Sequence, residues 1–159
     1  MPPVQVCDPQ DLPTDALLAQ IVDRFHEGRR RDLAALIPQA QALDAAGAVP
    51  PVAEAVAAFA EALEPHMFKE EARLFPMTEQ GRNTLMVQLI DAMRAEYRGH
   101  EDHAAALQAL VDELTVPAAT APAATQFRAA FAELMAELAE HVRTEDEVLF
   151  PRFERGRSG

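Results

Sequence analysis

The sequence predicts an all-α protein that folds as one up-down-up-down four-helix bundle. Apolar residues make up 49% of the 159 residues, whereas the chain has only six Gly and no Trp, a balance that favours helices over sheets. Four long stretches place apolar residues at steps of three and four, and Pro- or Gly-containing segments separate them. A chain of this length can bury a core within one domain. We therefore expect a bundle over residues 14–154, preceded by an irregular arm (1–13) and followed by a tail (155–159).

The first helix is predicted to begin at Thr14 or Asp15, either of which can cap it, and to reach about Ala46. Its apolar stripe leads to His26. Pro38 should kink or end this helix, because proline lacks the backbone N–H and clashes with the preceding turn.

The second helix is predicted from about Val52 to Phe75. Its apolar stripe steps by four and three, and the same steps continue onto His66 and Glu70. Polar residues thus occupy the core stripe, and Pro65 should bend the axis beside them. The stripe consists of Val52, Val56, Phe59, Leu63, His66 and Glu70.

The third helix should begin at Asn83 or Thr84 and end near Leu114, and its stripe passes through Tyr97 and His100. The fourth should begin near Pro122 and reach at least Phe150. Its stripe again runs from apolar to polar: Phe127, Phe131, Leu134, Leu138, His141 and Glu145.

A repeated motif relates the second and fourth helices. Residues 66–76 and 141–151 both read H-x3-E-[ED]-x2-L-F-P, at an offset of 75 residues that also relates the stripes before them. Residues at i and i+4 share one helix face, so each copy offers an imidazole and a carboxylate side by side. The repeat suggests two helix-turn-helix halves about a pseudo-twofold axis, in which His26 and His100 occupy nearly equivalent places.

This pattern predicts a metal site inside the bundle. Burying these imidazoles and carboxylates without partners would be costly, and bound cations offset that cost. Histidine and carboxylate ligands without thiolate suit non-haem iron, manganese or zinc. Because two carboxylates can bridge two ions, we expect a di-iron centre, with a mixed manganese–iron pair as an alternative.

Charge and composition exclude several classes of partner. A formal net charge of −12 argues against nucleic acid and anionic membranes. No stretch approaches about 20 apolar residues, and the N-terminus does not resemble a signal peptide. The single cysteine, Cys7, cannot form an internal disulfide, so we expect an inert thiol and a cytoplasmic protein.

At these residues the chain resembles the hemerythrin-like HHE cation-binding family, and within it the di-iron domain of repair-of-iron-centres proteins. The matching stretches are residues 21–27, 66–76, 93–96 and 141–151. The resemblance implies a hemerythrin-like bundle with two iron ions held by four His and two bridging Glu. Carried over by position, the ligands are His26, His66, Glu70, His141 and Glu145.

The third helix departs from the family pattern. The family's M-R-x-E-H places a histidine where this chain has Tyr97. The Tyr97 phenolate could bind the metal, His100 could replace the missing ligand one turn later, or the position could stay open. These alternatives remain open from the sequence.

The resemblance implies a role in nitrosative or oxidative stress or in the repair of iron centres. The small ligand would be NO, O2 or peroxide, and damaged iron–sulfur proteins are possible partners. Three alternatives are a reversible O2 carrier or sensor, a peroxide-consuming enzyme and a bundle that has lost its metal. The sequence does not indicate the oligomeric state.

Overall fold

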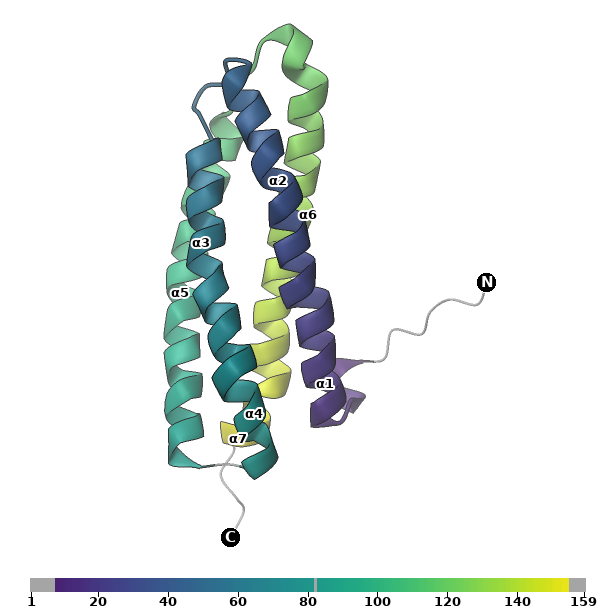
Figure 1. Cartoon of the computed structure of the whole chain (residues 1–159), viewed down its shortest axis with the longest axis vertical. Helices are drawn as coiled ribbons and strands as arrows, with labels where there is room; N and C mark the ends of the chain where they lie inside the picture. The colour runs from purple at the N-terminus through teal and green to yellow at the C-terminus, as the bar shows by residue number, and fades with distance from the viewer. Residues whose placement is uncertain (1–7, 82, 155–159) are drawn as a thin grey trace, which may run out of the picture.

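The computed structural model describes residues 8–81 and 83–154, and it is a bundle of four antiparallel helices (Figure 1). Cys7 and the predicted tail at 155–159 lie outside the described residues. The chain runs up, down, up and down along the long axis of the bundle, as the sequence predicts. α2 contacts α3 and α6, and α5 contacts the same two helices.

Each bundle helix except the third is assembled from shorter segments. The short 3-10 turn η1 (Pro9–Asp11) precedes the first. The first consists of α1 (Thr14–Gln20), η2 (Ile21–His26) and α2 (Glu27–Ala45), and the second of α3 (Ala53–Lys69), η3 (Glu70–Leu74), α4 (Phe75–Met77) and η4 (Thr78–Gln80). The third is α5 (Thr84–Glu113). The fourth follows the 3-10 turn η5 (Ala118–Thr120) and consists of α6 (Ala121–Thr144), η6 (Glu145–Leu149) and α7 (Pro151–Glu154).

The predicted helix ends are confirmed in part. Asn83 caps α5, because its side-chain oxygen accepts a hydrogen bond from the Met86 amide at 2.8 Å. The expected cap at Thr14 or Asp15 is wrong: Pro13 holds the N-cap position and no side chain caps it. The prediction that Pro38 could end the first helix is also wrong, since α2 continues through it to Ala45.

Side-chain and backbone hydrogen bonds close the end of the bundle opposite the N-terminus. The Asp44 carboxylate accepts hydrogen bonds from the amides of Val52 and Ala53, at 2.8 and 2.9 Å, so the end of one helix caps the start of the next. Val49 and Thr115 exchange two backbone hydrogen bonds and join the two loops there.

The buried apolar residues form two clusters along the axis. The larger lies toward the joined loops and includes Leu36, Phe59 and Phe131. The smaller lies toward the other end and includes Ile21, Ile90 and Phe150. Buried polar residues separate them, and this polar layer contains His26, Arg29, His66, Glu70, His141 and Glu145. The described helices include none long and apolar enough to cross a membrane.

Candidate metal centre

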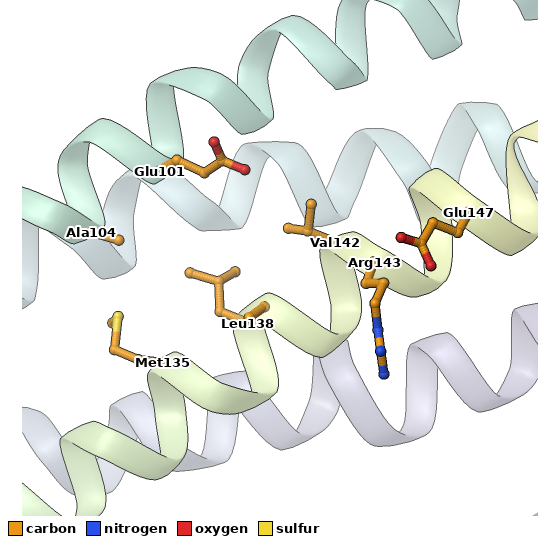
Figure 2. Close-up of a pocket in the computed structure, with 8 residues that line it drawn as sticks. Glu101, Ala104, Met135, Leu138, Val142, Arg143 and Glu147 are labelled. Atoms are coloured by element: carbon orange, nitrogen blue, oxygen red, sulfur yellow. The ribbon is translucent and has the colours of Figure 1, made fainter.

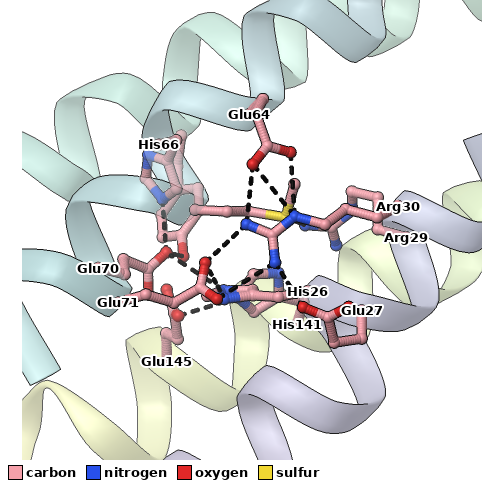
Figure 3. A network of polar contacts seen from close by, with 12 residues as sticks. His26, Glu27, Arg29, Arg30, Glu64, His66, Glu70, Glu71, His141 and Glu145 are labelled. Atoms are coloured by element: carbon pink, nitrogen blue, oxygen red, sulfur yellow. Dashed lines mark hydrogen bonds and ion pairs between the residues drawn. The ribbon is translucent and has the colours of Figure 1, made fainter.

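Four of the predicted ligands meet in the polar layer. His26, Glu70, His141 and Glu145 each offer one ligand atom, and these atoms all lie within 4.8 Å of one another. All four side chains are fully buried. They come from three different bundle helices, as Figure 3 shows, so the tertiary fold brings them together.

His66 lies against the same cluster. Its Nε2 is 2.8 Å from Glu70 Oε1, and His26 Nε2 is 3.9 Å from that oxygen on the other side. On the fourth helix, His141 Nε2 is 2.9 Å from Glu145 Oε1. The two H-x3-E pairs therefore face each other across the bundle, each with its imidazole beside its carboxylate (Figure 3).

π-helical turns present these residues to the interior. η2 ends at His26, η3 begins at Glu70 and η6 begins at Glu145. In a π turn the hydrogen bond spans one residue more than in an α-helix, and such turns occur often at functional sites. η3 and η6 are 75 residues apart, so the backbone irregularity is repeated with the motif.

The donor atoms of the cluster fit a metal. Both ring nitrogens of His26, Nδ1 of His141, and one oxygen each of Glu70 and Glu145 are buried without a hydrogen-bond partner among the described residues. Buried polar atoms are ordinarily paired, because desolvation otherwise costs about 1–3 kcal/mol per group. Imidazole nitrogens and carboxylate oxygens are ligands for first-row transition metals.

The comparisons with known proteins agree with this site. The family model of the hemerythrin HHE cation-binding domain matches residues 17–155. The chain belongs to the hemerythrin HHE cation-binding family. The family and fold predicted from the paired H-x3-E motifs are therefore confirmed, and the buried His/Glu cluster fits the cation binding that gives the family its name.

The relatives include proteins described as iron-sulfur cluster repair protein YtfE. The one from Edwardsiella ictaluri is 34% identical over 158 residues, covering 94% of this chain and 70% of that protein. The one from Musicola paradisiaca is 30% identical over 149 residues, covering 91% and 67%, and the one from Yersinia pseudotuberculosis is 29% identical over 154 residues, covering 94% and 70%.

The electrostatics of this hemerythrin-like cluster reflect the close approach of two buried carboxyls. Burial raises the pKa of Glu145 well above its ordinary value, and the nearby charge of Glu70 raises it further. Burial also acts to raise the pKa of Glu70, but hydrogen bonds with Glu145 and His66 outweigh it and lower that pKa to about 2. Burial lowers the pKa of His26 and of His141, so both imidazoles are neutral and able to bind a metal at neutral pH.

Tyr97 and His100 occupy different environments on α5. Tyr97 is 4% exposed, its hydroxyl donates a 3.3 Å hydrogen bond to Glu70 Oε1, and its ring lies 4.5 Å from that of His66. His100 is half-buried, and its ring lies 5.1 Å from the His66 ring, edge to face. Of the two residues, the structure therefore brings Tyr97 against the cluster.

Two carboxylates outside the cluster contact its imidazoles. Glu96 Oε2 lies 2.7 Å from His66 Nδ1, and the other Glu96 oxygen accepts a hydrogen bond from Lys69. Glu71 Oε2 lies 3.6 Å from His26 Nδ1 and pairs with Arg30 at 2.6 Å. Carboxylates that hold the second ring nitrogen orient a metal-binding histidine and increase its basicity.

The sequence analysis missed Arg29. It lies in a run of three arginines, a pattern typical of a solvated surface, yet its side chain is only 4% exposed. The available signal was periodicity, because Arg29 follows Phe25 by four residues and precedes Leu33 by four on the buried stripe.

A surface groove of about 450 Å³ lies between α5 and α6 (Figure 2). Apolar side chains dominate it, with charged ones among them; its lining consists of Glu101, Ala104, Met135, Leu138, Ala139, Val142, Arg143 and Glu147. None of these is a predicted ligand. The cluster itself is internal, which restricts its ligands to small molecules.

Proposed function

We propose that this chain is a non-haem di-iron protein that responds to nitrosative or oxidative stress and acts in the repair of iron centres. The observation that carries this is the buried His26–Glu70–His141–Glu145 cluster with His66 beside it, in a chain of the cation-binding family. These five residues would hold the two ions. A manganese–iron pair would use the same ligands.

In this proposal the residues have distinct roles. Glu70 and Glu145 come from facing helices, and their carboxylates would hold the ions together with the imidazoles of His26, His66 and His141. Bound iron would supply the redox chemistry toward NO, O2 or peroxide, while the surrounding apolar clusters exclude bulk water from the site.

Similarity to the YtfE proteins supports damaged iron–sulfur proteins as partners. Their name describes iron–sulfur cluster repair, and the aligned region includes nearly the whole of this chain. The centre would then either remove the reactive small molecule or supply iron to the damaged cluster, in the cytoplasm.

Tyr97 is the residue of α5 that we assign to the centre, in preference to His100. Its hydroxyl already contacts Glu70, whereas His100 lies one turn away and is half-buried. If Tyr97 binds ferric iron as phenolate, the oxidised protein should have a purple charge-transfer band that Tyr97→Phe abolishes. A fully loaded ferric protein without the band would show that Tyr97 only hydrogen-bonds Glu70.

Metal analysis combined with the optical spectrum of the oxidised protein tests the proposal. We expect about two iron ions per chain, and loss of metal in both His66→Ala and His141→Ala. Retained stoichiometry in both variants would contradict the ligand assignment. Anaerobic reconstitution followed by exposure to air should give irreversible oxidation, whereas a stable oxygenated spectrum would indicate an O2 carrier instead.

A further inference from the structure

Arg29 is a buried cation that has no ion-pair partner within the part of the chain that the structure describes. Its Nε and Nη2 have no hydrogen-bond partner among the described residues, and its Nη1 donates a hydrogen bond to Met67 Sδ at 3.8 Å. Among residues 8–81 and 83–154, no carboxylate oxygen lies within 4.0 Å of its guanidinium. Its neighbour Arg30, in contrast, pairs with Glu27, Glu64 and Glu71.

Arg29 nevertheless remains charged. Burial lowers its pKa to about 10, and the charges of Glu145 and Glu70, followed by those of Glu137 and Asp32, act in the opposite direction. A group with this pKa is protonated at neutral pH. Arg29 lies three residues after His26 on the first helix, and its Nη1 reaches Met67, the residue that follows His66 on the second, so the guanidinium lies between two of the histidines proposed as ligands.

The charge of the loaded site is unbalanced. The positive charges of two iron ions, ferrous or ferric, together with that of Arg29 exceed the two negative charges of Glu70 and Glu145. Excess charge in a water-excluded site is costly, so the site would favour an additional anion. The unpartnered N–H groups of Arg29 are hydrogen-bond donors of the kind that bind small oxyanions and pseudohalides.

We propose that Arg29 makes the metal centre selective for small monovalent anions such as azide, nitrite or hydroperoxide. This inference rests on the proposed metal centre. The guanidinium stabilises the bound anion by its charge and its free N–H groups, and it gives no such advantage to a neutral ligand. Arg29 therefore determines specificity and is not itself a metal ligand.

Azide titration of the oxidised, iron-loaded protein tests this role. The ligand-to-metal absorption band gives the Kd of azide, and NO binding to the ferrous form serves as the neutral comparison. We expect Arg29→Met to raise the azide Kd by at least about tenfold, because the variant removes both the buried positive charge and the N–H donors that would hold the anion. Arg29→Lys should stay within about threefold of the wild type, and NO affinity should stay within about twofold throughout.

The exposed neighbour provides a matched control. Arg31 lies two residues along the same helix and is exposed, so Arg31→Met should leave the azide Kd unchanged. Arg29→Gln removes the charge but keeps hydrogen-bonding capacity, and it replaces Arg29→Met if circular dichroism shows that the Met variant does not fold. An iron-loaded uncharged variant with wild-type azide affinity would overturn the inference alone. A wild-type protein that takes up no iron would overturn the metal centre and, with it, this inference.

Discussion

At the scale of single residues, the chemistry of the site depends on two carboxyls that share one buried space. Glu70 and Glu145 cannot both be ionised there without counter-charge, so in the metal-free protein the proton stays on Glu145. Divalent ions would replace this proton and pair with both carboxylates. Glu70 and Glu145 would thus lower the stability of the metal-free protein and contribute to its affinity for metal ions.

Glu145→Gln should separate these two effects. The folded-state pKa of Glu145 is raised, so its contribution to stability is complete below its ordinary pKa of 4.5 and is lost as pH rises through the folded value. Glutamine does not titrate. We therefore expect the metal-free variant to be more stable than the metal-free wild type, by a margin that grows as the pH rises from 4.5 toward the raised folded-state pKa of Glu145, by up to about 1.4 kcal/mol per pH unit.

Urea unfolding in the presence of chelator at several pH values measures this margin. The variant should also lose metal. Glu133→Gln, at an exposed position of the same helix, serves as the control and should show no growing margin. A margin that does not change with pH would contradict the shared-proton description of the pair.

Glu96→Ala tests the orientation of His66. Glu96 holds His66 Nδ1 at 2.7 Å, and it lies outside the cluster, half-buried on α5. Removing it should weaken metal binding about 10–100-fold, because the ring is no longer held in its metal-binding orientation, while the fold is retained. Competition with a chelator measures the affinity; Glu101→Ala, exposed on the same helix, should behave as wild type.

The residues whose burial was predicted best from the sequence are polar residues that continue an apolar helical stripe. His66, Glu70, His141 and Glu145 continue apolar stripes, so the fold that buries the stripes also brings them into one layer. Tyr97 and His100 could not be separated in this way, because both lie on the α5 stripe and only the packed structure shows which one contacts Glu70. Burial of Arg29 was not predicted, because a run of three arginines is typical of a solvated surface and only the tertiary packing decides which of them is buried.

At the scale of elements, the second and fourth helices of the bundle repeat each other, whereas the first and third helices differ. The second and fourth helices share both the motif and the π turn. The first helix has a π turn ending at His26, whereas α5, described over its whole length, is regular α-helix through Tyr97. Helix positions and lengths follow from apolar periodicity, but a single π turn leaves almost no trace in that pattern, and so it was not predicted.

Deletion of Arg73 should show what the π turn of the second helix contributes. Removing one exposed residue from Glu70–Leu74 allows ordinary α-helical hydrogen bonds there. The helical segments before and after it can still turn the same residues toward the core. We expect helicity to be retained while iron binding falls by more than about tenfold, because Glu70 is displaced. Arg73→Ala keeps the turn and should bind metal normally; normal iron content in the deletion variant would mean that the π turn does not position Glu70.

At the scale of the whole molecule, the polar layer divides one apolar core into two clusters. An uninterrupted apolar stripe would stabilise the bundle more in the absence of metal, since each buried unpaired group opposes folding. The fold class could be predicted because the apolar residues of the two clusters recur at helical spacing along four separate stretches of the sequence. The identity of the ions could not, because imidazole and carboxylate ligands suit several metals.

Metal removal should therefore destabilise the entire bundle. A ligand that binds only the folded state adds about 2.7 kcal/mol at one hundred times its Kd, and for a domain of this size each kcal/mol shifts Tm by about 2–4 °C. We expect chelation to lower the Tm of the iron-loaded protein by about 5–10 °C.

The ligand variants test where the stabilising metal binds. His66→Ala and His141→Ala should not show this drop in Tm on chelation, because both residues contribute to the cluster that would bind the ions. His103 lies outside the cluster, with its ring packed against Phe59 at 5.2 Å, so His103→Ala should still show the drop. Scanning calorimetry with and without chelator measures each difference, and an equal drop in all three variants would place the stabilising metal outside this site.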